Sequence, residues 1–262
     1  MTPSPPHDPR APIRFAESAL QLLDQGGFTA TYKYAVLLAL MDLCLEGTGK
    51  DGAPPTMVTT RQLAEKVIDL YWPQTRPFLP PLDRPLSQTR GKDKQAKIVA
   101  DIDAFQRADP GLSLHAARSF DAHADRWRRL VDDVEWTLIL MPLPRLQTVG
   151  GRTLRLIYEI RWGLDIERQK ADVRAYQRAL ATGTPTAAAQ RFDNAIRFIP
   201  GAEHHLVTLV TARKQLEPFT AGLLTACRRR RCSAHLEVRL RSPPRQTARM
   251  LDGDPAPATC AP

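Results

Sequence analysis

The stretch from Tyr34 to Leu45 constrains this chain more than any other, because Asp42 is its only charged residue. A helix that is apolar on nearly every side cannot lie on a surface and must be covered by neighbouring elements. The stretch is also shorter than the roughly 18 apolar residues that a membrane span requires. We therefore predict a buried central helix in a soluble protein that has no membrane partner.

Composition agrees with a globular chain. The 262 residues are 43% hydrophobic and 25% charged, which is enough apolar material for a packed core. The first ten residues, MTPSPPHDPR, contain no apolar stretch behind a basic start, so we expect no secretory leader and a cytoplasmic location. The four cysteines are too few for a disulfide framework in a chain of this length.

Apolar residues recur at helical spacing on both sides of the central helix, and one β-hairpin interrupts them. A capping-box pattern, Thr59-x-x-Gln62, opens one of these helices. We predict further helices with Phe15, Ala19 and Leu22 inward, over Lys92–Ala108, around Trp127–Leu138, over Ile166–Ala181 and over Glu203–Leu216. We predict a hairpin with strands Leu146–Val149 and Arg152–Trp162 around Gly150-Gly151, and a strand at Ala195–Ile199.

These elements predict a mainly α fold of the α+β type, a helical domain with a small β-hairpin insertion. Its predicted parts are a disordered lead (1–12), a helical domain (13–140), a β-hairpin plus helices (141–215) and a low-order basic tail (216–262).

Net charge is concentrated near the C-terminus. The chain has a formal net charge of +9, and residues 213–262 hold ten basic and four acidic side chains, against 27 and 24 in residues 1–212. A basic excess favours nucleic acid or another polyanion as partner. The tail itself lacks helical or strand periodicity, and Cys227 and Cys232 enclose four arginines. Two explanations stay open: the reading frame is lost between Thr211 and Cys232, or the tail is a natural basic disordered segment.

Five segments together resemble the N-terminal region of a bacterial family of HNH endonucleases. They are FTATYKYAVLLALMDL (28–43), TTRQLAEKVIDLYWPQTRPF (59–78), the stretch 87–98, MPLPRLQTVGGRTLRLIYEIRW (141–162) and RFDNAIRFIPGAEHHLV (191–207). The resemblance covers about residues 13–210 and rests on the order of the segments. It implies a DNA-engaging part of a nuclease, with the catalytic module beyond it.

The sequence departs from that family where the family has its nuclease centre. The family places a Cys-x-x-Cys zinc site around a ββα-metal unit with a histidine-rich motif, and this chain has neither that cysteine pair nor a His-Asn-His constellation. We therefore assign no catalytic residue, expect no metal or other cofactor in this chain, and expect it to lack nuclease activity.

Two groups of basic residues are the candidate DNA contacts. Arg61 and Lys66 are predicted to be exposed on the helix that begins after Thr59, which is a possible winged-helix element. The second group opens the predicted helix at Lys92, where lysines and backbone N–H groups can share a phosphate; its members are Arg90, Lys92, Lys94 and Lys97. A solvated charged face is the competing interpretation of both groups.

Other patterns are weaker candidates for chemistry. Asp132, Asp133 and Glu135 can bind magnesium in principle, but we favour a solvated face balanced by neighbouring arginines at i,i+4 spacing. Cys227, Cys232 and His235 supply only three potential zinc ligands at an unusual spacing, so incidental placement is favoured. Adjacent His204 and His205 point about 100° apart on a helix and do not share a metal face. The Glu159-x-Arg161 pair lacks the lysine and aspartate of the nuclease motif it resembles.

Three functions are consistent with these observations. The first is the DNA-engaging, structural N-terminal part of an HNH-type endonuclease-like protein. The second is a stand-alone helix-turn-helix-like DNA-binding regulator. The third is a protein-interaction domain with a partner protein.

Overall fold

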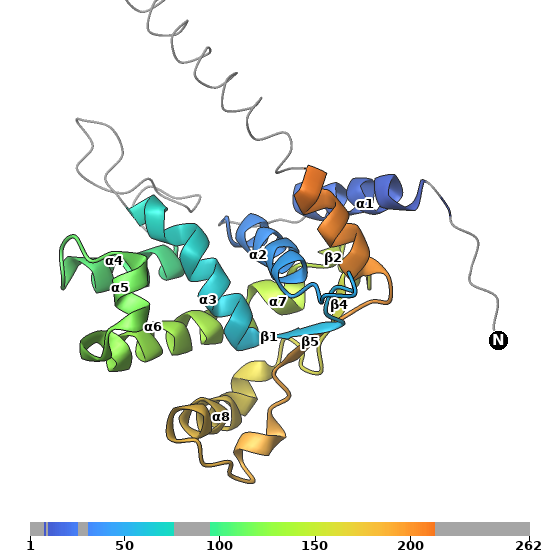
Figure 1. Ribbon diagram of the computed structural model, residues 1–262. Coiled ribbons are helices and arrows are strands. Elements are labelled where there is room, and N and C mark those ends of the chain that lie inside the picture. Colours follow the sequence, from blue (N-terminus) through green and yellow to red (C-terminus); the bar gives the residue numbers. More distant parts are fainter. Residues whose placement is uncertain (1–7, 9, 26–30, 76–94, 213–262) are drawn as a thin grey trace, which may run out of the picture. The chain divides into compact units, whose positions relative to one another are not determined.

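The central helix is α2 (Tyr32–Glu46), and it is buried as its composition predicts. Val36, Ala39 and Leu40 are completely enclosed in the computed structural model of the chain, which describes residues 8, 10–25, 31–75 and 95–212. Helices α3 and α7 pack against α2 (Figure 1). The predicted lead and basic tail lie largely outside the described residues. All described residues belong to one unit, Met1–Arg213.

Helix α3 (Thr60–Tyr71) begins at the predicted capping box. The N–H of Gln62 donates to Thr59 Oγ1 at 3.1 Å, and the N–H of Thr59 donates to Gln62 Oε1 at 2.9 Å. Each bond satisfies a backbone donor that the first turn of a helix leaves without a partner. A short 3-10 helix, η1 (Trp72–Thr75), follows where Pro73 prevents the α-helix from continuing.

Three helices cover the other side of α3. They are α4 (Lys97–Arg107), α5 (Leu114–Ser119) and α6 (Asp121–Leu140). Helix α6 packs against all of α3, α4 and α5. The rings of Trp72, Phe105 and Trp127 meet at centroid distances of 5.9 to 6.4 Å and fill the space among these helices. The predicted helix from Lys92 begins only at Lys97 in the described residues, because Gln95 and Ala96 are not helical.

A three-stranded antiparallel sheet brings together distant parts of the chain. Its order is β1-β5-β4, with strands Met57–Thr59, Ala195–Phe198 and Tyr158–Glu159. Val58 lies opposite Ile196, and Tyr158 lies opposite Phe198. The predicted strand at 195–199 is confirmed. Strand β1 was not predicted, and β4 falls within the predicted strand Arg152–Trp162 but pairs with β5.

The predicted hairpin is confirmed at its turn and wrong in its second strand. Strands β2 (Thr148–Val149) and β3 (Arg152–Thr153) pair around Gly150 and Gly151, whose φ angles of +55° and +80° suit glycine. Pairing stops after Thr153, because the Gln147 side chain takes over the backbone groups of residues 156–158. The predicted alternation of the long strand is therefore lost, and adjacent Ile157 and Tyr158 are both buried.

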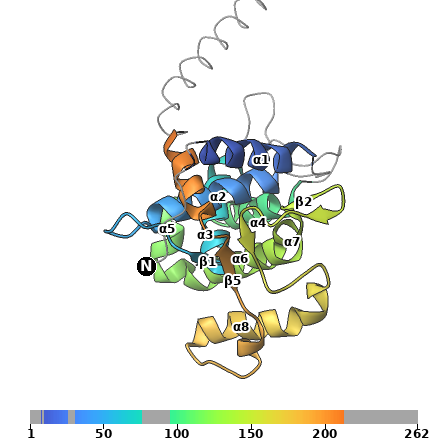
Figure 2. The same ribbon diagram turned by 90° about the vertical axis from the view of Figure 1, so that its right-hand side faces the viewer.

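The remaining helices are α7 (Pro142–Arg145), η2 (Ile166–Gln169), α8 (Lys170–Thr182), η3 (Ala189–Arg191), α1 (Ala11–Gln25) and a helical segment over residues 202–212. Among them, α1 and α8 lie at opposite ends, with α2, α6 and the sheet between them (Figure 2). Helix α1 begins inside the predicted lead, since the Asp8 carbonyl accepts the N–H of Ala11. Phe15 of α1 contacts the His205 ring at 5.0 Å. The predicted regions 13–140 and 141–215 share one hydrophobic core over their described residues.

Candidate nucleic-acid interface

Arg61 lies on α3 but is not an exposed surface residue as predicted. Its side chain is 20% exposed, and its guanidinium pairs with Asp132 and, at 3.4 Å, with Glu135 Oε2 of α6. Burial alone lowers the pKa of Arg61, but the two carboxylates outweigh it and hold the pKa above its usual value. The charge of Arg61 is thus neutralised inside the protein.

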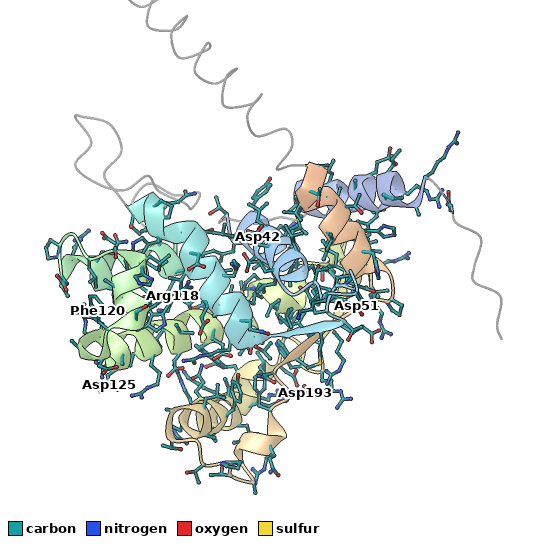
Figure 3. All side chains as sticks on the ribbon, in the orientation of Figure 1. Asp42, Asp51, Arg118, Phe120, Asp125 and Asp193 are labelled. Carbon is teal, nitrogen blue, oxygen red and sulfur yellow. The ribbon has the colours of Figure 1, made fainter. Side chains whose placement is uncertain are left out.

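Lys66 also forms ion pairs within the protein, and it is largely covered, contrary to the prediction that it is exposed. Its side chain is 18% exposed, and Nζ lies 2.7 Å from Glu46 of α2 and 3.9 Å from Asp69. Asp69 in turn pairs with Arg118 of α5, which is labelled in Figure 3. Burial raises the pKa of Asp69 although both cations lower it. These four residues tie α2, α3 and α5 together.

Of the predicted basic cluster, only Lys97 lies among the described residues. It is the first residue of α4, its side chain is 57% exposed, and its ammonium pairs with Asp101 at 2.7 Å. An exposed i,i+4 pair of this kind is weak, so Lys97 is accessible to an anion. Arg90, Lys92 and Lys94 lie outside the described residues, as do Cys227, Cys232 and His235.

The acidic cluster on α6 is not the solvated face that we predicted. The Glu135 side chain is completely buried, and Asp132 is 19% exposed beside Arg61. Asp133 alone fits the prediction, with 51% exposure and a 3.4 Å contact to Arg174 of α8. The prediction failed because the stripe that holds Glu135 is covered by α3 and α8, and helical spacing does not show which polar residues a neighbouring helix will cover.

Glu135 accepts hydrogen bonds from two elements, α3 and α8. Thr60 Oγ1 donates to Oε1 at 2.6 Å, and Gln177 Nε2 donates to Oε2 at 3.1 Å. The Tyr176 hydroxyl lies 3.3 Å from Oε1 and accepts a 2.8 Å hydrogen bond from Asn194 Nδ2. Burial raises the pKa of Glu135, while Thr60, Gln177 and Arg61 lower it. These donors occupy the carboxylate, so the arrangement joins α3, α6 and α8 and leaves no open position for a substrate.

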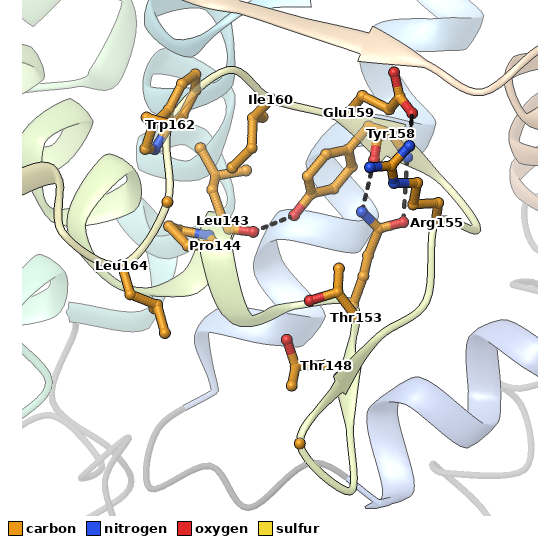
Figure 4. A pocket seen from close by; sticks show the side chains of 13 residues that line it. Leu143, Pro144, Thr148, Thr153, Arg155, Tyr158, Glu159, Ile160, Trp162 and Leu164 are labelled. Carbon is orange, nitrogen blue, oxygen red and sulfur yellow. Dashed lines mark hydrogen bonds and ion pairs between the residues drawn. The ribbon is translucent and has the colours of Figure 1, made fainter.

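A pocket of about 480 Å³ lies between α7 and the chain that follows the hairpin (Figure 4). Leu143, Pro144, Trp162 and Leu164 supply its apolar wall. The Tyr158 hydroxyl donates to the Leu143 carbonyl at 2.8 Å and fixes the floor. The polar side is formed by residues of and after the hairpin, namely Thr148, Thr153, Arg155 and Glu159.

Sequence reasoning overlooked several polar side chains that the core encloses. Gln147 is 5% exposed, and its side chain bonds backbone groups of residues 156–158. Gln177 is 3% exposed, and its Nε2 donates to the Asp132 carbonyl and to Glu135. Lys33 is 1% exposed, donates to the Leu22 carbonyl and has a pKa lowered by burial. The sequence shows only that these polar residues have apolar neighbours, and that does not distinguish a buried polar side chain from an exposed one.

The described residues carry no net charge. They contain 22 of the 37 basic and 22 of the 28 acidic side chains. The excess belongs by sequence to residues 76–94, with five basic and two acidic side chains, and to residues 213–262. The positive charge that would attract a polyanion therefore belongs mainly to those two segments.

Glu159 and Arg161 do not form a nuclease-like pair. Glu159 contacts Arg155 at 3.2 Å, whereas Arg161 contacts Asp193 on the loop before β5, labelled in Figure 3. His204 bonds Glu203 and His205 contacts Phe15, so the two histidines diverge. Within the described part of the chain, no group of three or more His, Cys, Asp or Glu side chains is placed to share a metal ion.

No helix in the described ranges has both the length and the apolarity needed to cross a bilayer. No protein-family model, curated protein or solved structure matches this chain.

Proposed function

We propose that this chain is the DNA-engaging and structural N-terminal part of an HNH-type endonuclease-like protein, and that it has no nuclease activity of its own. The observation that carries the proposal is the order of the five segments that resemble that family. Their described parts pack together: α2 contacts α3 and α7, and the sheet joins Thr59, Tyr158 and Ile196. Segments that share a core are under a common structural constraint, which supports treating the resemblance as one unit.

DNA is the proposed partner because of where the charge lies. The whole excess of nine positive charges falls in two stretches of sequence, 76–94 and 213–262, while the rest of the chain is balanced. Lysines and arginines that neutralise phosphates release counterions and make binding to DNA favourable at low salt.

The regulator alternative has less support. A recognition helix must present its basic residues to the major groove. In α3 the candidate residues Arg61 and Lys66 are engaged with carboxylates of α6 and α2. The protein-interaction alternative retains one favourable observation: Leu20 and Tyr34 are 64% and 53% exposed beside a second cavity of about 480 Å³ between α1 and α2.

Duplex-DNA binding by the full chain tests the proposal. Fluorescence polarisation should show affinity that falls steeply with salt, and the same protein should leave plasmid DNA intact with magnesium, manganese or zinc. Two variants that each remove four positive charges locate the contacts: Arg90, Lys92, Lys94 and Lys97 to alanine, and Arg228–Arg231 to alanine. If all four side chains of a group contact phosphates, its variant reduces the slope of log K against log salt by about 3.6.

The possible outcomes separate DNA binding from the protein-interaction alternative and test the absence of nuclease activity. No binding at low salt refutes the DNA proposal and leaves the protein-interaction domain. Plasmid nicking that disappears when a carboxylate of this chain is replaced refutes the absence of nuclease activity.

A further inference from the structure

The β2–β3 hairpin is exposed, but hydrogen bonds hold its base to the rest of the protein. Residues 150–155 are all exposed, including both glycines of the turn. The base of the hairpin is held by Gln147, whose carbonyl accepts the N–H of Leu154 at 2.7 Å. Gln147 Oε1 also accepts the N–H of Ile157 at 2.6 Å, and Nε2 donates to the Tyr158 carbonyl at 2.7 Å. The backbone that carries the hairpin side chains is therefore held in place, which reduces the conformational entropy lost when they bind a ligand.

Three exposed arginines belong to this hairpin or to the residues that flank it in sequence. Arg145 ends α7 next to the pocket residue Pro144, Arg152 begins β3 between two pocket residues, and Arg155 lines the pocket itself. We call Arg145, Arg152 and Arg155 the hairpin arginines. All three are exposed, with Arg155 at 77%.

The hairpin arginines carry charge that the surroundings do not neutralise. Among the described residues Arg145 and Arg152 have no ion-pair partner, and Arg155 contacts only Glu159, at 3.2 Å and half exposed. From Arg145 to Arg161 the chain contains four arginines and a single acidic residue. The described residues as a whole are balanced, so this stretch of the chain carries more positive charge than the described residues on average.

We propose that the hairpin arginines form a contact surface for the phosphate backbone of duplex DNA. This inference rests on the proposed function and names the part of the described structure that carries it out. Guanidinium groups match phosphate oxygens with two parallel hydrogen bonds each. The pocket that Arg155 lines offers an apolar wall of Pro144 and Leu164 to the sugar carbons beside those phosphates. Charge complementarity selects DNA over an apolar partner at this surface.

A charge-matched pair of full-chain variants tests the inference. The hairpin variant replaces Arg145, Arg152 and Arg155 with alanine. The control variant replaces three arginines of α4 and α6 with alanine, namely Arg107 and Arg129, which are exposed, and Arg128, whose side chain is 40% exposed. None of the three lies on the hairpin or lines the pocket. Both variants lose three positive charges. The hairpin variant should reduce the slope of log K against log salt by about 2.7, at 0.9 per phosphate, and the control variant by less than 1.

Photocrosslinking locates the contact with DNA without changing the net charge of the protein. Leu154 on the hairpin is 42% exposed and Phe120 at the start of α6 is 57% exposed. Replacing each singly with p-benzoylphenylalanine in the full chain should give crosslinks to duplex DNA from position 154 at least fivefold above those from position 120. Unchanged thermal unfolding of each variant shows that the fold is preserved.

The result that overturns the inference is distinct from failure of the proposed function. Equal slopes for the hairpin and control variants, or equal crosslinking from the two positions, overturn the hairpin surface while DNA binding by the unmodified chain still stands. Absence of DNA binding by the unmodified chain overturns both.

Discussion

Replacing Arg61 with methionine should destabilise the protein far more than removing an ordinary surface arginine. Methionine keeps the apolar part of the side chain and removes the cation that faces Glu135 and Asp132. Breaking a fully buried ion pair by removing one partner costs about 3–5 kcal/mol. Arg61 is one-fifth exposed and Glu135 keeps hydrogen bonds from Thr60 and Gln177, so we expect about 2–3 kcal/mol at pH 7.

The cost should depend on pH. Burial raises the pKa of Glu135 in the folded protein above its unfolded value, so between the two values the folded state binds more protons. The free energy of unfolding therefore falls as pH rises through that window. Arg61 lowers this pKa, and its removal raises the pKa further and widens the window. The difference between wild type and variant should be smaller at pH 5 than at pH 7, changing by at most about 1.4 kcal/mol per pH unit.

Urea unfolding followed by far-UV circular dichroism at both pH values measures these quantities. Arg107→Met is the matched control, because Arg107 is 72% exposed in an i,i+4 pair with Asp103 and should cost about 0.5 kcal/mol or less. The double variant Arg61→Met, Glu135→Gln should recover part of the loss and show little pH dependence from this site. If Arg61→Met costs no more than Arg107→Met, the buried network does not hold α3 and α6 together as we argue.

Two further substitutions probe local structure. Gln147→Met should lower the free energy of unfolding by about 2–4 kcal/mol, because it leaves the N–H groups of Ile157 and Tyr158 without their acceptor; an unchanged urea midpoint would contradict this. Thr59→Ala should cost about 1 kcal/mol by removing the N-cap of α3, measured against Thr184→Ala on an exposed loop; equal midpoints for these two variants would show that the cap contributes nothing.

Local patterns predicted the long elements well. The apolar stretch of α2, the capping box of α3 and the spacing in α6 and α8 all reflect interactions within a few residues, and each helix is present. Strand β1 was missed because its three residues are too few to show alternation, and β4 lies inside the predicted strand Arg152–Trp162 but has β5 as its partner. Both exist through pairing with β5, which local sequence does not reveal.

The candidate site was harder to predict for the same reason. Arg61, Lys66 and Glu135 are polar residues next to buried faces, and their sequence neighbours do not distinguish a solvated position from a covered one. Whether each residue is covered depends on a partner on another helix, which is α6 for Arg61, α2 for Lys66 and α8 for Glu135. Gln147 was missed because no pattern marks a side chain that replaces a strand partner.

The strand order β1-β5-β4 has a consequence for how the chain folds during synthesis. The middle strand, β5, is the last of the three to be synthesised. Thr59 therefore cannot pair with Ala195, nor the N–H of Thr60 with the carbonyl of Asn194, until that part of the chain has been added. Until then β1 and β4 have no partner in this sheet, since each pairs only with β5. Contacts so distant in sequence are slow to form, and unpaired strand edges favour aggregation. A nascent chain that pauses between residues 160 and 195 is therefore the form most in need of chaperone protection, although the finished fold is mostly helical.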